Sequence, residues 1–500
     1  MKKLYTIICI MLLSISAFSQ ESFRVEWEID DYARPKSAIK SSNGNTLIIG
    51  QINLQNNNDF DAFIFKMLPN GDYSYIRTSA PPDTSTIYRD IIQLNNGNFF
   101  VIGVNGASNY NNSDEQYKLV TAIFDENLNL ISEKKYNYDY TYKSIGSVKI
   151  LHEENGNILL AASAVRFSGS PSNYIDLGLF RFTPEGDTIE TKFYHYERNV
   201  YIYDFKKIPE SDNYLILEFT TQWYGDFECY VLKPDLTAEC INYHSSYDYS
   251  VNEDLTLAYW YPDKSFMMGS SMSLSEKERD IGLGVFRCDT LANISDYLFL
   301  NHVDIYDQHA PSQCMSYADE NSIYITGFVA DYGNCENPDS IELYVVDTAL
   351  NQVAYKSLGG DMSYEIFGVL TANDGGAIIY GSAINYKNDC SPNLVVYYVS
   401  RDELGLPPVK VFDIKKTDDQ DLVYPNPACD IVNIRVKKKL LHNRSRIRLY
   451  NSFGKKIYDY RLPSIGNTLQ LDVSNLDKGV YIYKIVNDES VISAGKFIKQ

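Results

Sequence analysis

The sequence predicts an all-β fold class, a seven-bladed β-propeller followed by a small immunoglobulin-like β-sandwich. Three observations lead to this prediction. A turn-plus-strand signature returns seven times, at intervals of 53, 59, 56, 51, 58 and 54 residues. Asn-Gly and related turns separate short apolar runs throughout the chain. Finally, the composition becomes basic after residue 420, which marks a separate module.

Each repeat unit begins with a tight turn that leads into its second strand. The seven copies are NGNTLIIG (43–50), NGNFFVIG (96–103), NGNILLAA (155–162), SDNYLILE (211–218), PDKSFMMG (262–269), ENSIYITG (320–327) and DGGAIIYG (374–381). A polar loop, a third strand, another turn and a fourth strand follow. Four short strands at a constant period are typical of propeller blades. An open β-solenoid is the alternative, but its repeats are usually shorter.

Closing the ring requires one strand from outside the seven units. The apolar run Phe23 to Glu28 precedes the first complete unit and is predicted to fill the fourth-strand place of the last blade. Val409 to Ile414 competes for the same place. Closure would leave no long sheet edge open to aggregation.

Both the amino terminus and the charge indicate export. Residues 1–19 read as a secretory signal with a basic start, an apolar core and an Ala17-Phe18-Ser19 cleavage site. No later run approaches the ~20 apolar residues that a membrane span needs. Residues 20–420 hold 29 Lys/Arg against 58 Asp/Glu, a formal charge of −29. This acidic body argues against nucleic acid or an anionic membrane as a partner.

Export also permits disulfides. Cys229 and Cys240 flank a predicted turn symmetrically, and Cys335 and Cys390 occupy the same loop of successive repeats. Both pairs are therefore candidate disulfides. No C-x-x-C pair supports zinc binding or redox chemistry.

Strand order predicts that the tight turns lie on one face of the ring and the long loops on the other. Variable loops on a rigid scaffold usually carry binding, so the long-loop face is the predicted ligand face, with Trp223 and Tyr224 as candidate contacts. Acidic residues recur at the loop ends, and they either cap turns or bind calcium, which prefers oxygen ligands: Asp61, Asp176, Asp226, Asp280 and Asp339. We expect no cofactor, with calcium as the open alternative.

The segment from Thr371 to Gly376 reads T-A-N-D-G-G and opens the last repeat. It resembles the delta-60 or kelch-like repeats of bacterial secreted propellers. The resemblance covers roughly residues 35–405.

The carboxy-terminal module opens with Tyr424-Pro425-Asn426-Pro427 and continues with alternating strands that favour a β-sandwich. It resembles the type A sorting domain of the type IX secretion system of Bacteroidetes over its whole length. The matching residues are the opening four with Asp430, then Leu449, Tyr450, Asn451, Gly454 and Lys455, and finally Leu476, Gly479, Val480 and Tyr481. The resemblance implies transport across the outer membrane, removal of the module by the sorting peptidase, and release or attachment at the cell surface.

The predicted organisation is a signal peptide (1–19), a propeller (20–412), a linker (413–422) and a sorting domain (423–500). No G-x-S-x-G elbow or H-E-x-x-H motif is present in the sequence. We therefore expect a secreted or surface-bound, non-enzymatic binding or adhesion module for an unknown glycan or protein. A polysaccharide-active hydrolase or lyase, using carboxylates on the long-loop face, is the alternative. A purely structural surface component is a third reading.

Overall fold

The structure, a computed structural model, describes most of the chain. The described residues are 21–29, 32–53, 59–78, 84–107, 116–167, 175–196, 199–220, 227–244, 249–251, 255–274, 281–300, 307–329, 339–384, 392–408, 422–435, 446–451, 456–461, 468–476, 478–487 and 490–500. The chain divides into two compact units, Met1–Val409 and Lys410–Gln500. The predicted signal peptide and most of the predicted linker lie outside the described residues.

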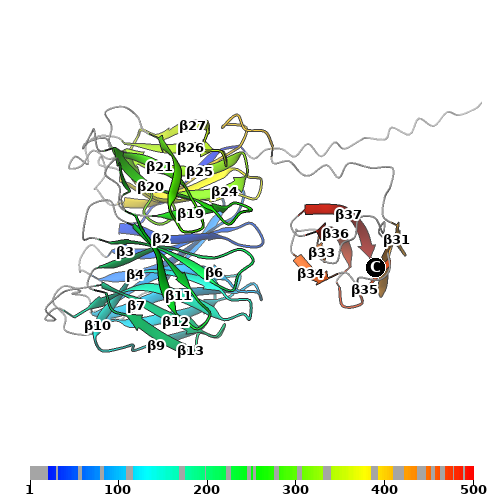
Figure 1. The fold of residues 1–500 in the computed structure, drawn as a ribbon, viewed down its shortest axis with the longest axis horizontal. Coiled ribbons are helices and arrows are strands. Elements are labelled where there is room, and N and C mark those ends of the chain that lie inside the picture. The colour runs from blue at the N-terminus through cyan, green and yellow to red at the C-terminus, as the bar shows by residue number, and fades with distance from the viewer. Residues whose placement is uncertain are drawn as a thin grey trace, which may run out of the picture. The chain divides into compact units, whose positions relative to one another are not determined.

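The first unit consists of antiparallel sheets, each of which is one blade (Figure 1). Blade 1 is β2 (Tyr32–Lys40), β3 (Thr46–Asn53), β4 (Phe60–Met67) and β5 (Tyr73–Thr78). Blade 2 is β6 (Thr84–Gln93), β7 (Phe99–Ala107), β8 (Lys118–Phe124) and β9 (Leu130–Tyr136). Blade 3 is β10 (Tyr142–His152), β11 (Ile158–Arg166), β12 (Ile175–Phe182) and β13 (Thr188–Tyr194).

The innermost strand is divided in two of the remaining blades. Blade 4 is β14 (Val200–Lys207), β15 (Tyr214–Thr220), β16 (Phe227–Leu232) and β17 (Ala238–His244). Blade 5 is β18 (Tyr249–Val251), β19 (Thr256–Trp260), β20 (Phe266–Leu274), β21 (Ile281–Cys288) and β22 (Ile294–Leu300). Blade 6 is β23 (Asp307–His309), β24 (Met315–Asp319), β25 (Ser322–Val329), β26 (Ser340–Val346) and β27 (Gln352–Gly359).

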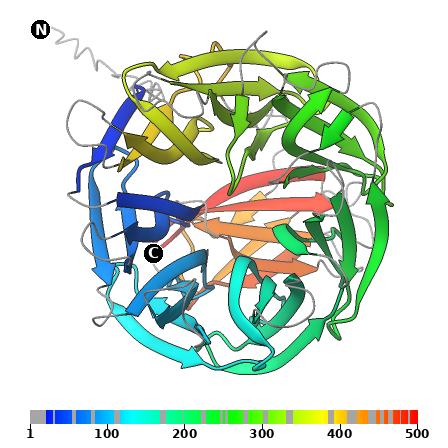
Figure 2. The same cartoon turned by 90° about the vertical axis from the view of Figure 1, so that its left-hand side faces the viewer.

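Blade 7 is β28 (Ser363–Thr371), β29 (Ala377–Ile384), β30 (Pro392–Val399) and, from the amino-terminal end, β1 (Phe23–Trp27). Strand β1 pairs antiparallel with β30, with Phe23 opposite Tyr398 and Trp27 opposite Leu394. The predicted clasp is therefore confirmed; the competing Val409 to Ile414 segment lies outside the described residues. Figure 2 shows the blades following one another around a ring.

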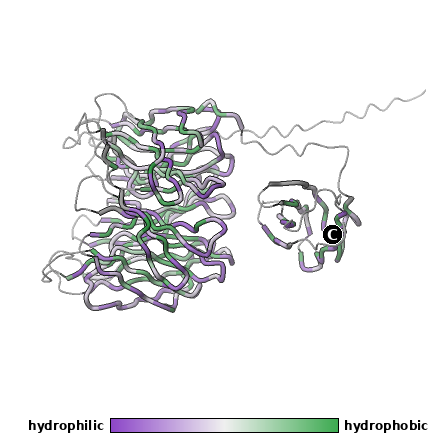
Figure 3. The backbone as a smooth tube through the Cα atoms, viewed as in Figure 1, coloured by the Kyte–Doolittle hydropathy of each residue, from purple (hydrophilic) through white to green (hydrophobic). Residues whose placement is uncertain are grey.

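Hydrophobic residues lie where neighbouring blades face one another. Strand β3 is buried along nearly its whole length, whereas β27 alternates between exposed and half-buried residues because it forms an outer edge. A strand covered on both faces needs a continuous apolar run, and an edge strand needs apolar residues only on one face. Figure 3 shows this distribution, with hydrophobic segments inside the blades and hydrophilic turns.

The glycine that ends the second strand of the repeat has a packing role. Gly50, Gly103 and Gly381 each lie opposite a β-bulge in the innermost strand of their blade. A Cβ at these positions would collide with a backbone carbonyl oxygen of that strand. The glycines therefore permit the bulges, whose extra residues are Lys36, Arg89 and Phe367.

Buried aspartates link neighbouring blades. The Asp90 carboxylate accepts hydrogen bonds from Ser37 Oγ of blade 1 (2.6 Å) and from the Ile150 N–H of blade 3 (2.8 Å). Asp204 accepts one from the Leu257 N–H of blade 5 (2.8 Å) in the same way. These bonds fix the innermost strands relative to one another.

Three residues of blade 6, Pro311 to Gln313, leave the sheet and enter the ring centre, and we call them the channel plug. The Ala310 N–H bonds to Thr326 O, and the Thr326 N–H bonds to Cys314 O. The channel plug therefore loops out of the sheet between Ala310 and Cys314. The Ser312 N–H bonds to Phe367 O of blade 7 (2.9 Å), and Ser312 Oγ donates to Lys36 O of blade 1 (2.6 Å).

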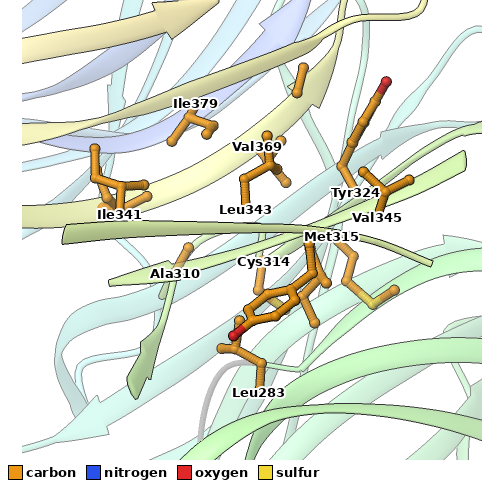
Figure 4. Packing of buried hydrophobic residues seen from close by; sticks show 14 of the residues in the cluster. Leu283, Ala310, Cys314, Met315, Tyr324, Ile341, Leu343, Val345, Val369 and Ile379 are labelled. Carbon is orange, nitrogen blue, oxygen red and sulfur yellow. The ribbon is translucent and has the colours of Figure 1, made fainter. Parts of the chain in front are cut away.

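Lys149 Nζ of blade 3 donates to Ser312 O (2.9 Å), which brings a further blade into contact with the channel plug. Ala310 and Cys314, the two ends of the extrusion, are buried in the apolar core around Leu343 and Val369 (Figure 4). The channel plug is thus anchored at both ends.

The second unit has two sheets around one core, as expected for the β-sandwich. One contains β31 (Leu422–Tyr424), β32 (Ile431–Arg435) and β35 (Thr468–Asp472). The other contains β34 (Lys456–Arg461), β33 (Arg446–Asn451), β36 (Gly479–Asn487) and β37 (Ser490–Lys499). In neither unit do the described residues include a helix long and apolar enough to cross a membrane.

The bulge geometry predicts that Gly103→Ala destabilises the propeller by about 1–3 kcal/mol, because the new Cβ would overlap the Ile87 carbonyl oxygen. Gly146→Ala is the matched control, since the nearest atom to its Cβ lies at 3.5 Å. Urea unfolding followed by tryptophan fluorescence measures both, because all 3 tryptophans of the sequence belong to the first unit, Met1–Val409. Equal stability of the two variants would contradict the packing role of Gly103.

Candidate functional site

A pocket of about 300 Å³ lies between the inner parts of blades 1, 2 and 3. It is formed at the strand ends from which the long loops leave, so it lies toward the predicted ligand face. Its lining residues are Arg34, Lys36, Gln51, Phe60, Ile87, Arg89, Val104, Tyr117, Ser144 and Ile145.

The charged residues that line the pocket are all basic. Arg34 and Lys36 come from β2, and Arg89 comes from the equivalent bulge in β6. Arg34 Nη2 forms an ion pair with Glu365 of β28, which orients its guanidinium group. The ring of Phe367 lies 5.6 Å from Arg34 Cζ and 5.9 Å from Lys36 Nζ.

The Lys36 ammonium lies in an unfavourable environment. Burial, together with the positive charges of Arg89 and Arg34 and against the opposing effect of Glu365, lowers the pKa of Lys36 to about 7. An anion placed among these three cations would restore the charged amine. The arrangement therefore has the electrostatic requirements of an anion-binding site.

The rest of the pocket wall is apolar with a few polar groups. Ile87, Val104 and Ile145 are buried aliphatic residues. Gln51 donates from Nε2 to Asn53 Oδ1 (2.9 Å), and Tyr117 donates to the Ala107 carbonyl oxygen. Such a wall accommodates a ligand with a charged group and a largely apolar ring face.

Several residues predicted from the sequence cannot be compared with this pocket. Trp223, Tyr224, Cys335 and Cys390 lie outside the described residues, as do Asp226 and Asp280. Their predicted roles stay predictions.

The predicted Cys229–Cys240 disulfide is wrong. Cys229 pairs with Asn242 across the hairpin, and Cys240 pairs with Tyr230, because a bulge shifts the register between them. Cys229 is buried and Cys240 is exposed, and neither takes part in a disulfide. The sequence symmetry about the turn did not reveal this bulge.

The acidic loop-end residues act through side-chain partners. Asp61 pairs with Arg77 Nε (2.6 Å), and Asp339 accepts from Ser363 Oγ (2.6 Å). No set of three or more His, Cys, Asp or Glu residues close enough to hold a metal ion lies in the described part of the chain. Calcium binding at the loop ends stays a prediction.

Asp176 has the most extensive set of partners of these acids. It accepts two hydrogen bonds from Arg166 (2.8 Å each), one from Tyr142 Oη (2.8 Å) and one from His195 Nδ1 (2.9 Å). Burial opposes ionisation, but these donors together hold the pKa of Asp176 below its usual value. Turn capping, one of the two interpretations from sequence, does not describe this residue.

The sequence contains a signal for the basic pocket in the spacing of its repeats. Lys36, Arg89 and Phe367 each stand 14 residues before the strand-ending glycine of their repeat. Aligning the first strands of the repeats would have shown two cations at one bulge position. The sequence gives a weaker indication of the channel plug. Pro311 cannot donate a backbone hydrogen bond, so it interrupts the innermost strand of its blade.

In the second unit, the Tyr424–Pro427 segment lies against the last strand. Asn426 Oδ1 accepts a hydrogen bond from the Ile498 N–H (2.9 Å), and Ala428 N–H bonds to Ile498 O (2.7 Å). Leu449 is buried in the core, and Tyr481 stacks on Phe497 at 5.6 Å. Gly454 and Lys455 lie outside the described residues.

The remaining motif residues complete the sandwich. Asp430 O accepts the Val473 N–H (2.8 Å), and the Leu476 N–H bonds to Val473 O (3.1 Å). Lys484 Nζ lies over the ring of Tyr450 at 5.4 Å, and Asn451 pairs with Tyr481 across the sheet. Gly479 and Val480 are the first two residues of β36.

Residues 422–500 match the sequence model described as the secretion system C-terminal sorting domain. These residues are a type IX sorting domain. The sorting domain connects the chain to the type IX secretion machinery and to secretion or display at the cell surface. No curated protein matches the chain.

Solved structures that resemble the chain have low identity to it. A fungal alcohol oxidase of the AA5 family, in complex with copper, is 11% identical and covers 96% of this chain and 99% of its own, with a TM-score of 0.46. A PL25 polysaccharide lyase, an ulvan lyase, is 9% identical. The match covers 76% of this chain and 96% of the lyase, with a TM-score of 0.48. An α-L-arabinofuranosidase from Fusarium graminearum is 11% identical. The match covers 77% of this chain and 99% of the arabinofuranosidase, with a TM-score of 0.38.

The pKa of Lys36 predicts a pH-dependent cost to stability. The unfolded lysine titrates near 10.4, so between about pH 7 and 10 only the unfolded state binds this proton. The destabilisation caused by charging Lys36 in the folded state is therefore complete below about pH 7. It decreases as the pH rises through this window, so the wild-type protein becomes more stable.

We accordingly expect Lys36→Met to raise the melting temperature by a few degrees at pH 6. The difference from wild type should shrink steadily toward pH 9.5. Thermal unfolding of the mature protein at several pH values measures it, with the exposed Lys118→Met as the control. A Lys36→Met variant less stable than wild type at pH 6 would contradict the account.

Proposed function

We propose that the protein is an exported binding module whose pocket holds an anionic group of an extracellular glycan, namely a carboxylate or a sulfate. The observation that carries this proposal is the cluster of Arg34, Lys36 and Arg89 around one pocket. It occurs in a segment, residues 20–420, whose formal charge is −29. A concentrated basic site in an acidic body attracts an anion locally while the remaining surface repels nonspecific polyanions.

An acidic sugar fits the pocket better than a small inorganic anion. The volume of about 300 Å³ is at the lower end of ligand pockets and exceeds what one sulfate needs. The apolar residues Ile87, Val104 and Ile145 offer a surface for the apolar face of a sugar ring. Gln51 and Ser144 offer polar atoms to its hydroxyls.

The pocket composition favours binding over glycoside hydrolysis. Hydrolases of most families use two carboxyl groups that flank the scissile bond. Here the three charged lining residues are cations. The hydrolase or lyase alternative would need catalytic carboxylates elsewhere on the long-loop face.

Isothermal titration calorimetry of the mature protein with D-glucuronate and with inorganic sulfate tests the proposal. Binding should be accompanied by uptake of about half a proton at pH 7, because Lys36 is half charged before binding and fully charged after it. Uptake should vanish at pH 5. Buffers of different ionisation enthalpy report the proton count.

Lys36→Met and Arg89→Met should each weaken glucuronate binding at least about tenfold, as expected on losing a charge-assisted contact. Lys118→Met should bind like wild type, because this exposed lysine does not line the pocket. Binding that is unchanged in both pocket variants would reject the proposed site. Tighter binding of uncharged glucose than of glucuronate would reject the anionic ligand.

A further inference from the structure

A second pocket, of about 280 Å³, lies between the outer parts of blades 2 and 3, and we call it the rim pocket. Its lining residues are Leu119, Tyr136, Asn137, Tyr138, Asp139, Phe180, Thr188, Thr191 and Phe193. The rim pocket shares no lining residue with the pocket around Lys36. The two pockets are therefore separate sites.

The aromatic side of the rim pocket is held in place by ring contacts. The Phe193 ring stacks on Tyr142, with centroids 4.4 Å apart, and meets Phe180 at 5.6 Å and an angle of 86°. Phe180 contacts Tyr138 at 6.5 Å, again at 86°. Phe193 pairs with Gly178 across the sheet, where a Cβ would come within 3.0 Å of the ring. The aromatic side is thus formed before any ligand arrives, which lowers the entropy lost on binding.

The other side of the rim pocket is polar. Asn137, Thr188 and Thr191 are exposed, and their side chains form no hydrogen bond with any other residue in the described part of the chain. Asp139 Oδ1 accepts the Thr141 N–H (2.8 Å), which orients the carboxylate. Hydrogen bonds from Thr141 also lower the pKa of Asp139, so this strong acceptor is ionised at neutral pH.

The two sides together determine which ligands fit. The one charged lining residue is Asp139, which repels anions. An entirely apolar ligand would displace water from the carboxylate and from the Asn137 amide without replacing their hydrogen bonds. A neutral sugar meets both requirements, because its ring C–H groups pack on aromatic rings while its hydroxyl groups bond to the polar side.

The shape of the rim pocket suits a chain of sugar units. Its lining positions on β13 run from Thr188 to Phe193, about 15 Å at the rise of an extended strand. Thr188, Thr191 and Asp139 are exposed, so a longer saccharide can continue into solvent. The volume limits the enclosed part to few sugar rings.

We propose that the rim pocket binds a neutral, linear oligosaccharide of pyranose units. One sugar ring packs against the aromatic side at Phe193, and its hydroxyl groups bond to Asp139 and Asn137. The inference goes beyond the proposed function, because it requires no anion and no residue of the pocket around Lys36.

Saturation-transfer NMR of the mature protein with cellobiose, xylobiose and mannobiose tests the inference. Saturation of aromatic protein protons should reach the ring C–H protons of at least one disaccharide, and titration gives its dissociation constant. Phe193→Leu keeps an apolar side chain but removes the ring, so it should weaken binding about two- to tenfold. Asp139→Asn keeps an oxygen that can accept the Thr141 N–H but loses the charge, and it should weaken binding by a similar factor.

Asp235→Asn is the matched control, because Asp235 also accepts an N–H two residues on, from Thr237 (2.9 Å), and does not line the rim pocket. Both Asp235→Asn and Lys36→Met should bind the disaccharide like wild type. Loss of disaccharide binding in Lys36→Met would overturn the inference by placing the sugar in the other pocket.

Two further results would overturn it. One is the absence of transfer to all three disaccharides, or transfer that is unchanged in both Phe193→Leu and Asp139→Asn. The other is tighter binding of tetramethylammonium than of any disaccharide, lost in Asp139→Asn, because the rim pocket would then be a cation site.

Discussion

Closure of the ring by β1 is the constraint on which the rest of the propeller depends. Strand β1 supplies the outer strand of blade 7, and Trp27 at its end packs on Phe63, Phe65 and Tyr75 of blade 1. The first and last blades are therefore joined by strand pairing and by an aromatic cluster. Only a closed ring brings β2, β6 and β28 to one centre, where their bulges contribute Lys36, Arg89 and Phe367.

Within that ring, the positions of the pocket cations follow from backbone geometry. A glycine in the second strand permits a bulge in the first, and each bulge places one extra side chain at the inner edge of its blade. The channel plug, Pro311 to Gln313, then bonds to the backbone of Lys36 and to the Lys149 side chain. A basic pocket arises where two neighbouring bulges both carry cations. Its charges lower stability, which is a common property of sites kept for binding.

Much of this architecture could be predicted because it depends on local sequence patterns. The repeat period, the Asn-Gly turns and the apolar run at Phe23 specify strands and the clasp, and the Tyr424-Pro425-Asn426-Pro427 opening indicates the sorting domain. Features that depend on register were missed. A bulge beside Cys229 separates it from Cys240, and the extrusion of Ser312 depends on contacts with three other blades. The pocket could not be predicted from the repeat signature alone, because its cations are the extra residues of bulges that only the strand register places opposite the glycines.

The proposed function requires that Arg34, Lys36 and Arg89 together form an anion site. Selenate is an anion that scatters anomalously, so a crystal of the mature protein soaked in selenate tests the claim directly. We expect an anomalous difference peak within hydrogen-bond distance of Lys36 Nζ and of at least one of the two guanidinium groups. Peaks confined to the protein surface, with the pocket empty at saturating selenate, would contradict it.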